Sequence, residues 1–102
     1  MTLDFRTETT KIPQTTGAFS TNESKPFGKR VRIAEVALKS FKLDYVGGAR
    51  TGDVVQVTAR LQSIGDEDVE YNLTTNYSGG TYTGEVTVLV IADVEERGGP
   101  IR

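Results

Sequence analysis

Residues 53–64 read DVVQVTARLQSI, and this stretch decides the fold class. Apolar side chains occupy the odd positions from Val55 to Leu61, and polar side chains occupy the even positions from Gln56 to Gln62. Successive side chains of an extended chain point to opposite faces, so this alternation predicts a strand with one buried face.

Two further strands follow along the chain. An acidic turn at residues 65–68 leads into a second alternating stretch, residues 69–75, so we expect a hairpin. Ser78-Gly79-Gly80 predicts another tight turn, after which residues 81–94 form a long strand. Leu89 and Ile91 make the second face of this strand apolar as well, so we expect a neighbouring subunit or the N-terminal segment to cover it.

Residues 29–43 fit two patterns. Ile33, Val36, Ala37, Ser40 and Phe41 have the spacing of a helical stripe, but a strand with a bulge near Ala34-Glu35 fits as well. The all-β context and the flanking Pro and Gly residues favour the strand. Upstream, we expect an edge strand around residues 3–9 and then a loop, with four anchors in this region: Phe5, Ile12, Phe19 and Phe27.

Composition excludes several classes of function. A chain of 102 residues indicates one domain, and it has no Cys, His or Trp, which removes disulfides, imidazole catalysis and histidine metal sites. A net charge of −2 gives no attraction for nucleic acid or an anionic membrane, and no stretch is long and apolar enough to cross a bilayer. Residues 1–10 do not resemble a signal peptide, so the sequence leaves the compartment open, with virion-associated and extracellular placements both possible.

The charged clusters predict solvated surface rather than chemistry. Asp66, Glu67 and Asp68 lie in a short polar turn, where acids are ordinarily solvated, and the cluster lacks the Gly and the distal Glu of a calcium loop. The basic run of Lys25, Lys29, Arg30 and Arg32 has no interleaved aromatic set for stacking bases. We therefore expect no enzyme activity, no metal and no cofactor.

One polar constellation fits a carbohydrate. Residues 75–78 and 81–83 combine amide, hydroxyl and phenol groups, which suit the hydroxyls and the C–H face of a sugar ring. The residues alone leave open that this is a polar strand end with Tyr82 packed at the edge of the core.

The order of motifs resembles the H-type lectins, a family of small β-sandwich domains. The resemblance begins at Gly17-Ala18-Phe19-Ser20, continues through Lys25-Pro26-Phe27 and the strand pattern of residues 57–64, and ends with Tyr82 and residues 86–92. It implies a six-stranded antiparallel sandwich over residues 17–94. The composition of the flanking segments predicts an arm or edge strand for residues 1–16 and a flexible tail for residues 95–102. The resemblance also implies a trimer, or a dimer of trimers, that binds galactose or N-acetylgalactosamine near subunit boundaries.

The family's sugar-binding residues carry over in part. Tyr82 stands where the family has a Tyr, whereas Asn76 replaces its aromatic platform and Gln56 lies near its Arg. Arg50, in a longer loop, is a substitute for that Arg, and Tyr77 adds a phenol. The sequence thus predicts a non-enzymatic module for weak, multivalent recognition of surface glycans. The alternative is a structural or assembly protein, such as a virion or tail component, that uses a lectin-like trimer without binding sugar.

Overall fold

The computed structural model describes residues 2–47 and 55–95, which form an all-β, antiparallel structure as predicted. Its four strands are β1 (Thr2–Pro26), β2 (Val31–Gly47), β3 (Val55–Ile64) and β4 (Asp68–Val94). Six separate strands were expected, but β1 and β4 are long enough for each to contribute two segments to the fold.

β4 is the centre of the sheet, because each of the other described strands pairs with it. β1 pairs along nearly all of β4, from Thr2 opposite Val94 to Pro26 opposite Asp68. β2 pairs with the second half of β4, and β3 pairs with the first half. The predicted hairpin of residues 53–64 with 69–75 is therefore confirmed over residues 55–64, since residues 53 and 54 lie outside the described residues, and Gly65 donates its N–H to the Asp68 carbonyl at 2.9 Å.

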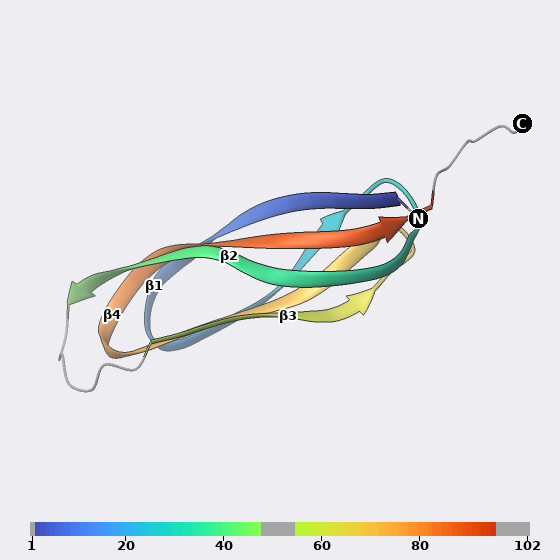
Figure 1. Ribbon diagram of the computed structural model, residues 1–102. Coiled ribbons are helices and arrows are strands. Elements are labelled where there is room, and N and C mark those ends of the chain that lie inside the picture. The colour runs from blue at the N-terminus through green and yellow to red at the C-terminus, as the bar shows by residue number, and fades with distance from the viewer. Residues whose placement is uncertain (1, 48–54, 96–102) are drawn as a thin grey trace, which may run out of the picture.

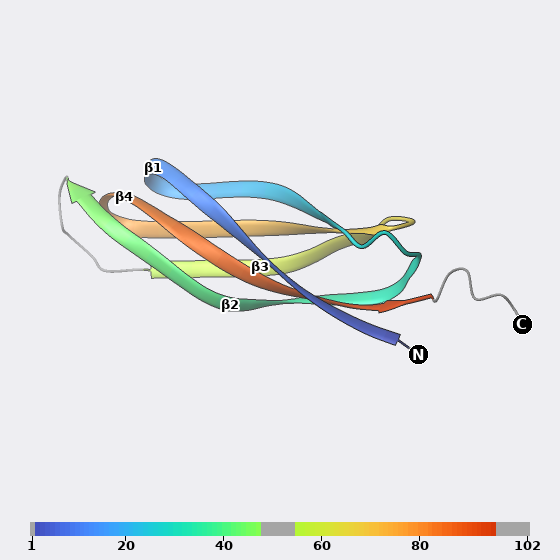
Figure 2. The same ribbon diagram turned by 90° about the horizontal axis from the view of Figure 1, so that it is seen from above.

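The sheet curls over on itself because both long strands bend at the same end of the molecule (Figure 1). β1 has register shifts between Ile12 and Thr15 and between Thr16 and Gly17, and Gly17 has a φ of +86°. The chain of β4 turns the same corner at residues 78–80, which fall between Tyr77, opposite Gly17, and Thr81, opposite Thr16. Seen from above, the two resulting layers cross at an angle (Figure 2).

This bend corrects the prediction of a second hairpin at residues 78–80. The segments on its two sides do not pair with each other, because both pair with β1 and lie in different layers. A Gly-Gly pair permits a corner as readily as a hairpin turn, and the long partner strand decides between them.

The core lies between the two halves of β4. Alternate side chains of each half point inward, and most of them are at most 1% exposed: Val69, Tyr71, Leu73, Thr75, Tyr82, Val86, Val88, Val90, Ala92 and Val94. The alternation predicted these inward positions correctly, and burial of each Val or Leu side chain among them stabilises the fold by roughly 1.5–3 kcal/mol.

The N-terminal region differs from the expectation beyond residue 9. The edge strand is present, but it continues to Pro26 where a loop was expected, because its Thr- and Ser-rich alternation matches the first half of β4. Ile12 and Phe27 are buried anchors at 3% exposure, and Phe19 packs against the core. Phe5 is 59% exposed and points away from the core, so its predicted role as an anchor was wrong.

β2 is a strand, as favoured over the helix. Its irregularities lie between Val31 and Ile33, Leu38 and Ser40, and Tyr45 and Gly47, not at Ala34-Glu35 as expected. Of the predicted tail, only Glu95 is described, and its N–H bonds to the Arg30 carbonyl at 2.8 Å.

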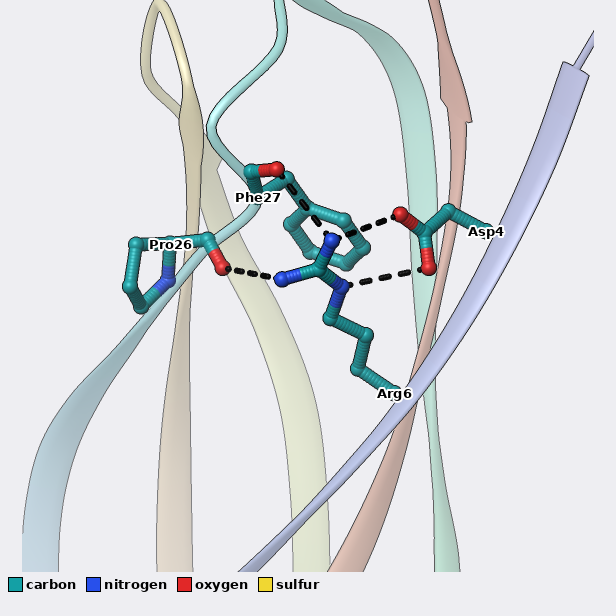
Figure 3. A network of polar contacts seen from close by, with 4 residues as sticks. All are labelled: Asp4, Arg6, Pro26 and Phe27. Carbon is teal, nitrogen blue, oxygen red and sulfur yellow. Dashed lines mark hydrogen bonds and ion pairs between the residues drawn. The ribbon is translucent and has the colours of Figure 1, made fainter.

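Polar groups join the two halves of β1 at one side of the curl (Figure 3). The Arg6 guanidinium donates to the carbonyls of Pro26 and Phe27, each at 3.3 Å, and lies 4.8 Å from the centre of the Phe27 ring. It also donates to Asp4 at 2.9 Å, which lowers the pKa of that carboxyl. Nearby, the Tyr71 hydroxyl donates to Glu8 at 2.6 Å.

Candidate functional site

A pocket of about 360 Å³ lies at the bent end of the molecule. It is lined by the end of β2, the start of β3 and the residues on either side of the β4 bend: Phe41, Leu43, Tyr45, Val55, Tyr77 and Tyr82. Four of these six side chains are aromatic, so the pocket offers ring faces and phenol hydroxyls with aliphatic groups between them.

Tyr82 is the fixed part of the pocket. Its side chain is fully buried, and its hydroxyl donates to the Gly17 carbonyl at 2.8 Å. Because a hydroxyl has one hydrogen, the Thr75 hydroxyl at 2.9 Å must act as the donor to Tyr82. The Tyr77 ring meets the Tyr82 ring edge to face, with centroids 5.9 Å apart and planes at 86°. The Tyr77–Tyr82 pair is therefore held in one orientation without a ligand.

The mouth of the pocket is formed by exposed side chains of β2 and β3. Phe41 is 49% exposed, Tyr45 42% and Val55 48%, although all three point toward the interior of the curl. They belong to strands that, among the described residues, form backbone hydrogen bonds with β4 alone. Apolar surface of this kind remains available to a ligand.

The structure places two of the predicted site residues in the pocket and two others on the opposite face of the sheet. Tyr77 and Tyr82 both line the pocket. Asn76 and Gln56 are register partners, but they belong to the alternate set of positions whose side chains point away from the core. The sequence reasoning grouped Asn76 with Tyr77 by proximity in the chain, yet adjacent residues of a strand face opposite ways. Arg50 lies outside the described residues.

Sequence reasoning missed Phe41, Tyr45 and Val55 as pocket residues. A signal was present, because Phe41, Leu43 and Tyr45 alternate with the charged residues Lys42 and Asp44. The bulge between Leu38 and Ser40 shifts the phase of β2, so the alternation upstream did not predict which face these rings occupy.

The lining of the pocket consists of aromatic and aliphatic side chains. It contains no carboxylate, lysine or arginine side chain among the described residues. The acidic turn lies elsewhere, and there Asp68 accepts a hydrogen bond from Ser24 at 2.9 Å. Within residues 2–47 and 55–95, no group of three or more potential metal-ligating side chains is found, and no helix capable of crossing a membrane occurs.

Comparisons with known protein families, with curated proteins and with solved structures found no match for this chain.

Proposed function

We propose that this chain is a non-enzymatic binding module that holds a sugar ring of a surface glycan in the aromatic pocket. The observation that carries the proposal is the lining itself, with Phe41, Tyr45 and Tyr77 around a volume of about 360 Å³. Ligand pockets in proteins have volumes of roughly 300–1,000 Å³ and are lined mainly by aromatic and apolar groups with a few polar ones.

A pyranose ring suits these groups chemically. Its C–H face packs on an aromatic ring, and its hydroxyls can both accept hydrogen bonds from phenol groups and donate hydrogen bonds to them. Tyr77 is already oriented by Tyr82, so little side-chain ordering accompanies binding at that wall. The proposed site thus keeps Tyr77 and Tyr82 from the sequence prediction and replaces Asn76 and Gln56 with Phe41 and Tyr45.

The resemblance to H-type lectins over residues 17–94 also supports this function. On the same basis, galactose or N-acetylgalactosamine glycans are the proposed ligands, and a trimeric sandwich-type assembly is the proposed form. One shallow, open pocket gives weak binding, and several linked copies raise the overall affinity through effective concentration.

Glycan-array binding of the purified chain tests the proposal. Phe41→Ala and Tyr45→Ala remove exposed rings, so the fold should persist while the array signal falls at least about tenfold, as expected for a lost ring contact of 1.4 kcal/mol or more. Asn76→Ala and Gln56→Ala are the matched controls on the opposite face, and binding should survive in both.

Two results would reject the site or the function. Loss of binding in the Asn76 and Gln56 variants, with binding retained in the Phe41 and Tyr45 variants, would move the site to the opposite face. No binding to galactose, N-acetylgalactosamine or acidic glycans by the wild type would reject glycan recognition.

A second candidate is a structural or assembly protein, such as a virion or tail component. Exposed apolar side chains on the outside of the sheet favour it: Leu3 is 51%, Phe5 59% and Ile33 63% exposed. Such a protein would form a stable oligomer and give no signal on the same array.

A further inference from the structure

The outer face of the β1–β4–β2 layer carries an apolar patch. The patch lies at the end of this face near the N-terminus and consists of Leu3, Phe5, Leu89, Ile91, Ile33 and Ala37. Toward the opposite end, β1 presents the polar side chains of Thr7, Thr9 and Lys11 on the same face. Leu89 and Ile91 were expected to be covered by a subunit or by the N-terminal segment. That segment instead lies beside them as β1, in the same layer, so no described part of the chain covers this outer patch.

The outer patch contains both a hollow and a projecting side chain. The hollow has a volume of about 170 Å³ and lies between β1 and β2 over β4, lined by Leu3, Ile33, Ala34, Glu35, Ile91 and Asp93. Phe5 stands opposite Ile91 in the register, two residues along β1 from Leu3, and projects into solvent at 59% exposure. An apolar cavity of about 150 Å³ is large enough to hold a benzene ring.

We infer that a second copy of this chain covers the outer patch, with Phe5 of each copy inserted into the hollow of the other. A two-fold axis in the plane of the interface, midway between Phe5 and the hollow, places both rings at once. In such an interface both copies use the same patch, so the patch must be complementary to itself. A projecting side chain beside a hollow meets this requirement. This inference does not depend on the proposed glycan function.

Charge and area fit this occupant. Two carboxylates lie on the wall of the hollow, Glu35 and Asp93. Asp93 already accepts from the Thr2 N–H at 3.2 Å and from Arg32 at 3.3 Å, so a partner need not supply a cation to Asp93, and the exposed Glu35 lies at the rim of the contact. The whole outer face of the layer, its polar end at Thr7, Thr9 and Lys11 included, is three strands wide and about ten residues long, which gives roughly 500 Å² in projection per copy. Two copies then bury on the order of 1,000 Å², the lower limit for a specific interface.

Mass in solution tests the inference. Light scattering on a sizing column at high protein concentration should give an even multiple of the 11.1 kDa chain. Phe5→Ser should halve that mass, whichever further contacts the copies make. Phe41→Ser is the matched control, because Phe41 is exposed to a similar extent on a different surface, and it should leave the mass unchanged.

Cross-linking tests the geometry directly, because the chain has no natural cysteine. Phe5→Cys and Ile33→Cys single variants, mixed and oxidised, should form a disulfide between two copies. Each variant then carries a single cysteine, so a disulfide between positions 5 and 33 can only join two copies.

The outcomes separate cleanly. Three results would each overturn the two-fold interface through Phe5. Phe5→Ser could leave the wild-type mass unchanged, Phe5→Ser could lower the mass by a factor of three, or the two cysteine variants could form no mixed disulfide. Circular dichroism of each variant excludes unfolding as the cause of a mass change.

Discussion

The Tyr82 hydroxyl donates a hydrogen bond to the carbonyl of Gly17 at 2.8 Å, and this bond joins the two bends of the molecule. Gly17 lies at the bend of β1, in the left-handed region with φ of +86°, and Tyr82 follows the bend of β4. One side chain therefore holds the corner of the curled sheet and, with its ring, lines the pocket.

Tyr82→Phe should destabilise the protein by roughly 1–3 kcal/mol, because the Gly17 carbonyl and the Thr75 hydroxyl lose a partner while the ring remains. Urea denaturation measures the change. Tyr77→Phe is the control, with an expected change below about 0.5 kcal/mol. Equal losses in the two variants would show that the Tyr82 hydroxyl does not hold the corner.

Tyr82→Ala should cost about 3–5 kcal/mol because it removes a fully buried ring. A loss of glycan binding in this variant therefore has to be compared with its loss of folding stability. Thermal unfolding of this variant, compared with Tyr45→Ala, checks the point. A variant as stable as the wild type would place Tyr82 outside the core.

Gly84→Ala should displace β2 from β4. A Cβ at this position would collide with the Lys42 carbonyl and lie 2.7 Å from Leu43 Cδ2, and backbone cannot move aside without breaking the sheet. Such overpacking costs roughly 1–3 kcal/mol. Gly47→Ala is the control, because a Cβ there meets nothing within 4 Å. Thermal denaturation of both variants should show a loss for Gly84→Ala alone.

Arg6→Lys should destabilise the protein nearly as much as Arg6→Ala, by about 1–2 kcal/mol in urea denaturation. A lysine keeps the charge but cannot donate to Asp4 and to two carbonyls from one planar group. Arg32→Lys is the comparison, since the Arg32 side chain is 46% exposed and makes one contact with Asp93, at 3.3 Å, which should contribute less than about 1 kcal/mol. Full recovery by Arg6→Lys would show that only the charge matters.

Alkaline pH should destabilise the wild type more than Tyr71→Phe. Burial, and then the hydrogen bond to Glu8, raise the pKa of Tyr71 above its ordinary value of 10.0, so the folded state keeps a proton that the unfolded state loses. Stability from this group is present below pH 10 and falls above it, by up to about 1.4 kcal/mol per pH unit. Urea midpoints at pH 8 and pH 11 check this, and identical pH dependence in the two proteins would contradict it.

The local patterns predicted strands well and their partners less well. Alternation in residues 55–61 and 69–75 identified both strands and their buried faces, because period two is a local property. The bend at residues 78–80 was not predicted, since a glycine pair fits a hairpin or a corner and only the long partner β1 selects the corner. Thr-rich residues 10–26 looked like a loop for the same reason: their strand depends on distant residues.

The lining of the pocket was half predictable. The phenol-bearing constellation included Tyr77 and Tyr82, which both line the pocket, but the side on which Asn76 and Phe41 lie depends on strand phase. Bulges in β2 reset that phase, and a bulge has no unique sequence signature when no glycine marks it.

The dependence of every described strand on β4 also sets the order of events during synthesis. Residues 68–94 leave the ribosome after β1, β2 and β3, so none of those strands has its partner until the last part of the sheet appears. Pairs such as Thr2 with Val94 span almost the whole chain, and non-local pairing of this kind slows folding. During synthesis the apolar residues of β1, β2 and β3 therefore stay unpaired and exposed to aggregation until β4 begins to emerge and the first native pairs of the described sheet form.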